Sequence, residues 1–361
     1  MTKPKKKSAL SEKDGVSQPK STSRDSISKL KNKRKKQPSS EELSDAILKG
    51  DKVALSRAIT LIESINPEHT HKANKIIEAC LPSANNSIRI GITGVPGVGK
   101  STFIESFGSY LTSIGKKVAV LAVDPSSSIS KGSILGDKTR MESLVKNDNA
   151  FIRPSPSGDS LGGVARKTRE TITLCEACGF DTIIIETVGV GQSETAVHSM
   201  VDFFLLLKLA GAGDELQGIK RGIMEMADAI IINKADGDNI NRAKQAKVDF
   251  TRALHLYPPK ENDWTPKVIT ASAYEKTGIA ATWELVLQYL DLTIKNRFFE
   301  HKRIQQNKQW LVQTINERLK SNFYNHQEIK TSLTQQLELI EQNKISPFAA
   351  ADYLFKLYNR T

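Results

Sequence analysis

The eight residues 94–101 constrain the fold of this chain more than any other feature, because they read G-V-P-G-V-G-K-S. This spacing is typical of a strand-to-helix loop whose backbone N–H groups wrap around a phosphate, with Lys100 neutralising phosphate oxygens and Ser101 binding Mg²⁺. An ordinary glycine-rich turn is the alternative, but the β-branched run at 88–93 and the helical pattern that follows supply the context that a phosphate loop needs. The sequence therefore predicts a phosphate site formed by Gly94, Val95, Pro96, Gly97, Val98, Gly99, Lys100, Ser101 and Thr102.

Short apolar runs recur after this loop, with helical stretches between them. They lie at 118–123, 182–185, 203–207, 229–232 and 268–270. Near-continuous apolar runs of this kind are typical of parallel strands that helices cover on both faces. The predicted fold class is therefore α/β, with a mostly parallel sheet.

A second motif follows the run at 229–232 and reads Asn233, Lys234, Ala235, Asp236. A carboxylate at the last position can accept hydrogen bonds from guanine N1–H and from the N2 amine, and adenine offers neither. Lys234 is expected to lie along the base and Asn233 to brace the phosphate loop. Ser272 and Ala273 follow the last predicted strand and suit a backbone contact to guanine O6. The nucleotide is therefore predicted to be GTP or GDP, bound by a P-loop GTPase domain.

Three acidic residues stand where a metal ion would need oxygen ligands. Asp124 and Glu186 each close a predicted strand, and Asp137 lies in the segment between them. Because the carboxyl ends of parallel strands meet at one edge of a sheet, these carboxylates are expected to converge with Ser101 on Mg²⁺. Each acid could instead be a helix cap or an ordinary surface group.

The segment after Glu186 reads E-T-V-G and stands in for the usual D-x-x-G, so Gly189 is expected to sense the γ-phosphate. Many GTPases carry a glutamine that orients the attacking water just after this glycine, but here Val190 takes that place and the nearest glutamine is Gln192. We therefore expect slow intrinsic hydrolysis that a partner or a dimer mate accelerates.

The net charge of +12 is concentrated at the N-terminus, because residues 1–40 hold thirteen Lys/Arg against three Asp/Glu and the rest of the chain is nearly neutral. Residues 1–38 are also rich in serine, which predicts a disordered basic tail rather than a nucleic-acid-binding fold. No apolar run approaches the length of a membrane helix, and three cysteines are too few for a disulfide framework. The expected location is the cytoplasm, or the mitochondrial matrix in a eukaryote, with no membrane partner and with nucleic-acid binding disfavoured.

Two further features have plainer explanations than chemistry. Cys175 and Cys178 resemble half of a zinc or redox site, but packing of the helix before the strand at 182–185 is the better account, since Cys80 is the only other cysteine. His198 lies near Gln192, yet GTP hydrolysis depends mainly on positioning and charge, so a structural or surface role is expected for it.

Several long motifs together resemble the MeaB/ArgK family, the G-protein chaperones of methylmalonyl-CoA mutase that include the methylmalonic aciduria type A protein. Beyond the phosphate loop they are A-V-D-P-S-S at 122–127, G-D-K-T-R-M at 136–141, R-P-S-P at 153–156, E-T-V-G-V-G-Q-S-E at 186–194 and G-D-E-L-Q-G-I-K-R-G at 213–222. The resemblance covers the chain from about residue 40 to its end.

The resemblance implies a GTPase that docks on an adenosylcobalamin-dependent acyl-CoA mutase, gates cofactor loading and helps to remove damaged cofactor. The residue patterns predict an N-terminal helical extension at 39–85, a GTPase domain at 86–282 and a helical region at 283–361, and the resemblance implies that this C-terminal arm makes homodimers. The chain carries no cobalamin-binding D-x-H-x-x-G motif, so cobalamin would be met through the mutase. The residues expected to act in hydrolysis are Lys100, Asp137, Glu186, Gln192 and, by resemblance alone, Lys220.

Three other interpretations remain open from the sequence. A metal-delivery GTPase usually carries a histidine or cysteine reservoir, which the first 40 residues lack. A kinase linked to basic amino-acid transport would transfer the γ-phosphate to an acceptor other than water. An RNA-binding GTPase would depend on the basic tail and would bind with a steep salt dependence.

Overall fold

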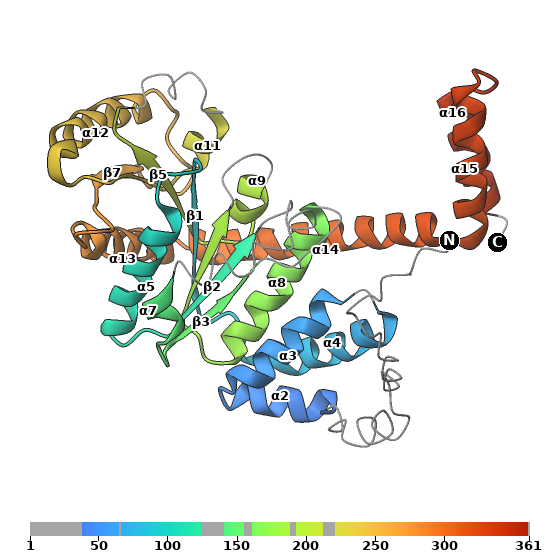
Figure 1. Ribbon diagram of the computed structural model, residues 1–361, viewed down its shortest axis with the longest axis horizontal. Coiled ribbons are helices and arrows are strands. Elements are labelled where there is room, and N and C mark those ends of the chain that lie inside the picture. Colours follow the sequence, from blue (N-terminus) through green and yellow to red (C-terminus); the bar gives the residue numbers. More distant parts are fainter. Residues whose placement is uncertain are drawn as a thin grey trace, which may run out of the picture. The chain divides into compact units, whose positions relative to one another are not determined.

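The computed structural model describes residues 38–64, 66–123, 141–154, 161–187, 193–211 and 221–359. Contacts divide the chain into residues 1–39 and a body, Ser40–Thr361, and the following description concerns the body (Figure 1). None of the described helices is both long enough and apolar enough to cross a membrane.

A seven-stranded parallel sheet with the order β3-β2-β4-β1-β5-β6-β7 forms the centre of the body. The α/β fold predicted from the apolar runs is confirmed. The sheet consists of β1 (Ile88–Gly94), β2 (Val118–Val123), β3 (Ala150–Arg153), β4 (Thr182–Thr187), β5 (Phe203–Leu209), β6 (Ala229–Asn233) and β7 (Lys267–Thr270).

Apolar layers cover both faces of the sheet, and the alternation along β4 shows how one strand contributes to both. Ile183 and Ile185 belong to the core formed with the N-terminal helices, whereas Ile184 belongs to the core on the opposite face. The second core includes α5 (Lys100–Ser113), α7 (Glu142–Val145) and α13 (Ile279–Lys295), and a third, smaller core joins β5 and β6 to α11 (Arg221–Met226) and α12 (Ile240–Leu254).

Three N-terminal helices pack on α8 (Leu161–Ala177) at one face of the sheet (Figure 1). Two of them begin with side-chain caps, because Asp51 accepts hydrogen bonds from Val53 N and Ala54 N, and Asn66 accepts one from Glu68 N. These helices are α2 (Ser40–Leu48), α3 (Lys52–Glu63) and α4 (Pro67–Cys80), followed by the short η1 (Leu81–Ser83).

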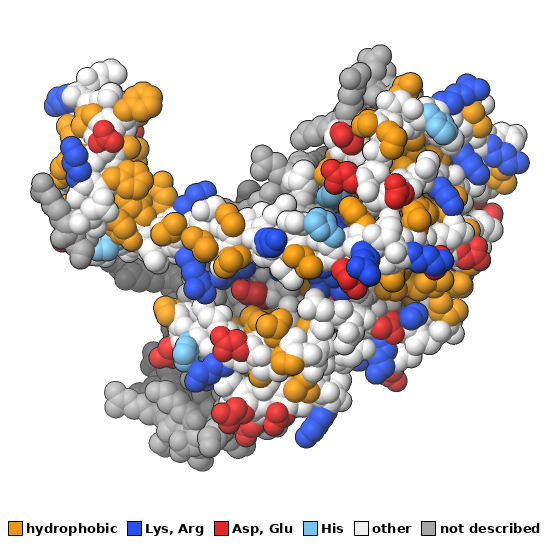
Figure 2. Space-filling model, turned by 180° about the vertical axis from the view of Figure 1, so that it is seen from behind, with side chains coloured by type: hydrophobic (Ala, Val, Ile, Leu, Met, Phe, Trp, Pro, Cys, Tyr) orange, Lys and Arg blue, Asp and Glu red, His pale blue; other side chains and the backbone are white. Residues whose placement is uncertain are grey.

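The C-terminal part of the chain is helical, as its sequence indicates. Arg297, with a left-handed φ of 62°, separates α13 from the 28-residue α14 (Phe298–Asn325). The two last helices, α15 (Gln327–Glu341) and α16 (Pro347–Tyr358), pack on each other, and α15 also contacts α14. Exposed apolar side chains gather along the second half of α14 and on α16 (Figure 2).

One strand, β3, was not predicted from the sequence. It has four residues, A-F-I-R, at the edge of the sheet, and only Ala150 is fully buried. So short and half-exposed a run lacks the apolar length that marked the other strands, and its pairing with β2 decides its conformation.

Cys175 and Cys178 are buried near the C-terminal end of α8, in the same core as Cys80. Burial raises the pKa of the Cys178 thiol to about 11. These side chains therefore pack as small apolar groups, which agrees with the structural account of the pair.

His198, at the end of α9 (Ser193–His198), packs edge-on against Phe204 with 5.5 Å between the ring centroids. Burial, together with the positive charge of Lys302, lowers the pKa of this imidazole to about 4. Because the unfolded chain binds this proton at about pH 6.5, the folded state is penalised as the pH falls from there towards about 4.

We predict that wild type loses about 2 kcal/mol of unfolding free energy relative to His198→Gln between pH 7 and about pH 4.5, with most of the loss below about pH 6.5. Urea unfolding of nucleotide-free protein at several pH values measures this difference. His301→Gln, which changes an exposed histidine on α14, is the matched control. Its unfolding free energy should differ from that of wild type by the same amount at every pH. A difference in unfolding free energy between His198→Gln and wild type that does not change with pH would contradict the prediction.

Candidate functional site

The loop between β1 and α5 has a backbone that only glycine adopts readily. Gly97 and Gly99 have left-handed φ angles of 82° and 91°. A Cβ at Gly94 would lie 2.7 Å from Leu207 O on the neighbouring strand, and one at Gly99 would lie 3.0 Å from Asn233 Nδ2. The glycines therefore allow both the curl of the loop and its close approach to β5 and β6.

Lys100 opens α5 and is 8% exposed. Its Nζ donates a hydrogen bond of 2.8 Å to Gly94 O, so the ammonium lies over the start of the loop. Burial lowers the pKa of Lys100, and the charges of Glu186 and Glu194 oppose this effect. A cation held here within the loop is placed to pair with phosphate oxygens.

Asn233 ends β6 and is almost fully buried. Its Nδ2 donates to Val98 O at 2.9 Å, so the side chain ties the end of β6 to the phosphate loop. Lys234, which has a left-handed φ of 57°, adds a second tie through a 2.9 Å hydrogen bond from its Nζ to Gly97 O. The two residues thus join the loop after β6 to the loop after β1.

Asp236 and Ser272 bring the loops after β6 and β7 together. The Ser272 hydroxyl donates to Asp236 Oδ2 and accepts a 3.0 Å hydrogen bond from Glu275 N. On the other side, Ser106 of α5 donates to Ala273 O at 2.6 Å. One carboxylate oxygen of Asp236 is therefore held by a buried hydroxyl in a loop that α5 also fixes.

Glu186 lies near the carboxyl end of β4, paired in register with Ile92 of β1 and with Ala122 of β2, and is 9% exposed. The next residue, Thr187, donates from its hydroxyl to the Thr93 hydroxyl at 2.8 Å, which links β4 to the end of β1. Together with the half-buried Ser101 in the first turn of α5, Glu186 offers the oxygen ligands that Mg²⁺ prefers.

Five residues predicted for the site lie outside the described residues: Asp124, Asp137, Gly189, Gln192 and Lys220. The structure does bring together the phosphate loop, Asn233, Lys234, Asp236, Ser272, Ala273 and Glu186, which arise from four separate strand ends.

No role was predicted for Glu194 from the sequence. It lies in the first turn of α9 and is 1% exposed, with Oε2 buried and without a hydrogen-bond partner among the described residues. Its charge acts on Lys100, so two carboxylates, Glu186 and Glu194, balance one loop cation. The signal was available, because Glu194 ends the motif at 186–194, but an acid one residue into a helix has the simpler explanation of a favourable helix dipole.

Comparison with known proteins is consistent with this geometry. The family model of "Methylmalonyl Co-A mutase-associated GTPase MeaB" matches residues 55–328. A "Putative GTPase" of Caulobacter vibrioides is 47% identical over 88% of this chain and 97% of its own. The mouse protein "Methylmalonic aciduria type A homolog, mitochondrial" is 42% identical over 88% of this chain and 79% of its own. A solved structure titled as a LAO/AO transport system kinase superposes with a TM-score of 0.69 at 36% identity, covering 90% of this chain and 99% of that one.

Proposed function

Because the chain belongs to the MeaB family of methylmalonyl-CoA mutase-associated GTPases, and so is a GTP-hydrolysing enzyme, we propose that it acts as a chaperone of an adenosylcobalamin-dependent acyl-CoA mutase. In this role it gates loading of the cofactor and protects or reactivates the mutase. The observation that carries the proposal is the family match over residues 55–328, which spans the nucleotide site and part of the C-terminal helices. We place this activity in the cytoplasm, or in the mitochondrial matrix in a eukaryote.

We assign the phosphate end of the nucleotide to the loop at 94–102. Its N–H groups and Lys100 would hold the β- and γ-phosphates, and Ser101 and Glu186 would hold Mg²⁺ together with Asp124 and Asp137. The bound ion supplies positive charge to the phosphate oxygens as charge builds up in hydrolysis. Among the described residues the buried Oε2 of Glu194 has no hydrogen-bond partner, and this carboxylate together with the curled glycine backbone fits a site that handles cations and phosphates. Gly189, Gln192 and Lys220 complete the proposed hydrolytic set.

We assign the base to Asp236, whose carboxylate would accept from guanine N1–H and from the N2 amine. Support comes from the hydroxyl of Ser272, which holds one carboxylate oxygen, and from Asn239, whose Nδ2 donates to Lys234 O at 2.7 Å. The loop is thus fixed before a base arrives, and a preorganised acceptor discriminates more sharply than a mobile one.

Replacing Asp236 by asparagine should weaken GDP binding about 10- to 100-fold, because an amide N–H would face the guanine N2 amine and leave a donor unpaired. The same variant should gain affinity for xanthosine diphosphate, whose C2 carbonyl accepts from that amide. Titration with fluorescent GDP and XDP measures both changes. Asp238→Asn, two residues away in the exposed turn η2 (Gly237–Asn239), is the control; an unchanged GDP affinity in Asp236→Asn would refute the assignment.

We further propose that the C-terminal helices join two copies of this chain. Leu311, Ile315 and Leu319 recur every four residues along α14 and are 63%, 47% and 60% exposed, so they form an apolar stripe on one face. Phe348 on α16 is 84% exposed. A stripe repeated along one long helix suits a second copy of the same helix, because a twofold axis makes one surface complementary to itself.

The double variant Ile315→Glu/Leu319→Glu should sediment as a monomer where wild type sediments as a dimer, because a dimer would bury four charges in an apolar interface. Analytical ultracentrifugation at micromolar concentrations distinguishes the two masses. Val145→Glu introduces a charge at an exposed apolar position on α7 and should leave the dimer intact. A monomeric wild type, or a dimeric double variant, would contradict the proposal.

Partner dependence tests the chaperone function itself. With no glutamine at position 190, we predict slow GTP turnover by the isolated protein and a rise of about tenfold or more when the host's acyl-CoA mutase is added. The label of γ-phosphate-labelled GTP should appear as inorganic phosphate, since transfer to a protein or amino acid would instead mark a kinase.

The mutase provides the second measurement. Under turnover it should lose activity more slowly when wild type and GTP are present than with the Lys100→Ala variant, which lacks the loop cation. Equal turnover with and without mutase, combined with equal rates of mutase inactivation, would overturn the proposed function.

A further inference from the structure

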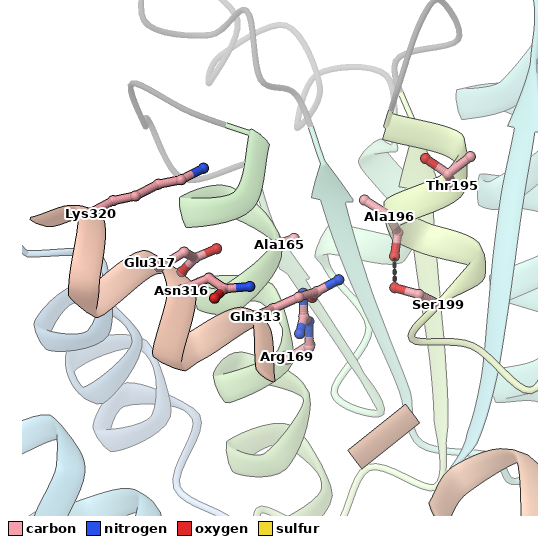
Figure 3. Close-up of a pocket in the computed structure, with 9 residues that line it drawn as sticks. All are labelled: Ala165, Arg169, Thr195, Ala196, Ser199, Gln313, Asn316, Glu317 and Lys320. Carbon is pink, nitrogen blue, oxygen red and sulfur yellow. Dashed lines mark hydrogen bonds between the residues drawn. The ribbon is translucent and has the colours of Figure 1, made fainter. Parts of the chain in front are cut away.

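A pocket of about 420 Å³ lies between α8, α9 and α14, and its lining includes no residue of the loops at 94–100, 233–236 and 270–273. Its volume lies within the range of small-molecule sites in proteins. Figure 3 shows Arg169 of α8 and Gln313 of α14 extending towards α9, where Thr195 and Ser199 form the opposite wall. Three elements that are distant in the sequence therefore surround one space into which several polar side chains project.

Arg169 is the central feature of this pocket. The residue is 7% exposed, its Nη2 donates to Gln313 Oε1 at 2.5 Å, and its Nε is buried without a hydrogen-bond partner among the described residues. Burial lowers the pKa of its guanidinium to about 10, so the group is charged at neutral pH. A buried cation with an unused donor leaves a desolvation cost that an anionic ligand can offset.

One aromatic ring fixes the orientation of this guanidinium. Trp310 of α14 stacks with Arg169 at 5.2 Å from the guanidinium carbon to the ring centroid. The indole Nε1 in turn donates to Ser199 O at 3.3 Å, which ties α14 to the end of α9. Arg169 is therefore held in place, as expected of a binding group rather than a mobile surface arginine.

The other lining groups define the chemical class of ligand. Lys320 adds a second cation and Glu317 a single carboxylate, so the lining carries one net positive charge with Arg169. This balance suits a monoanion better than a phosphate dianion. Thr195 and Asn316 add polar groups that can pair with a hydroxyl or an amine of the ligand.

We propose that this pocket binds a small organic carboxylate bearing a hydroxyl or amino group, with its carboxylate paired to Arg169. Lys320 lies at the same pocket as a second cationic partner, and Glu317 accepts from the ligand's hydroxyl or amino group. The site is separate from the nucleotide and stands whether or not the mutase is the partner.

The test uses the full chain in a buffer free of carboxylates, with the monoanions L-lactate and D-glycerate as probes and lactamide as the neutral counterpart of lactate. Trp310 provides an internal reporter, because a ligand that pairs with Arg169 changes the environment of the stacked indole. Calorimetry measures the same binding independently. We expect both acids to bind with dissociation constants of about 1 mM or below, and lactamide to bind at least about tenfold more weakly.

Variants separate this site from general anion binding. Arg169→Gln should weaken lactate binding about 10- to 100-fold, the effect of one charge-assisted hydrogen bond, and Lys320→Gln, at an exposed position, should weaken it about threefold. Arg166→Gln is the matched control, because Arg166 lies one turn away on α8, pairs with Glu170 at 3.7 Å and does not line the pocket. Trp310→Phe should remove the fluorescence change while calorimetric binding persists.

Several outcomes would overturn the proposal. They are no binding of either acid by wild type at about ten times the expected dissociation constant, equal binding of lactate and lactamide, or stronger binding of inorganic phosphate than of lactate. If Arg169→Gln does not fold, the Lys320→Gln variant provides the test, since unchanged lactate binding in that folded variant would contradict the cationic site.

Discussion

Parallel pairing of buried strands is the constraint on which the rest of this structure depends. The strands β4, β1, β5 and β6 lie side by side and are buried on both faces. Because they are parallel, each connection must run from the carboxyl end of one strand back to the amino end of the next. Every loop that follows a strand therefore begins on the same side of the sheet, where the strands have their carboxyl ends. Asn233 and Val98 are 135 residues apart in the chain, and the hydrogen bond from Asn233 Nδ2 to Val98 O is possible because β1 and β6 end on the same side of the sheet with only β5 between them.

Buried ion pairs stabilise the opposite side of the sheet, where the strands have their amino ends. Asp202 accepts a 2.8 Å hydrogen bond from Arg89 N and pairs with Arg303 of α14, while Arg89 pairs with the buried Glu176 of α8 at 2.9 Å. Such pairs cost desolvation, so their value lies in geometry more than in net stability. They fix α8 and α14 against the amino ends of β1 and β5, and the carboxyl edge can then carry loops chosen for binding.

The sequence was informative where local chemistry and tertiary role agree. The phosphate loop needs glycine at Gly97 and Gly99 for its own backbone, and five of the six runs read as strands extend in the structure by one or two residues while the sixth matches. The sequence was uninformative for residues whose role depends on contacts with residues far away in the chain. Arg169 looks like one more charge on an amphipathic helix, and its burial depends on Trp310, which follows 141 residues later. Edge strand β3, whose conformation depends on its pairing with β2, was not predicted for the same reason.

Helix α14 connects features that are otherwise separate. Near its start Arg303 binds Asp202 at the amino ends of the strands, and two to three turns later Trp310 and Gln313 contact Arg169 and the end of α9. The exposed stripe begins beside these residues and continues to Leu319. The α9 segment that it touches begins with Ser193 and Glu194, directly after the residues expected to respond to the γ-phosphate. A helix is stiff over this length. A shift of α9 that starts at its nucleotide-site end would therefore displace Ser199 and be passed to α14 through the hydrogen bond from Trp310. The proposed carboxylate pocket lies at that junction, where a ligand would change how firmly α9 is held against the arm.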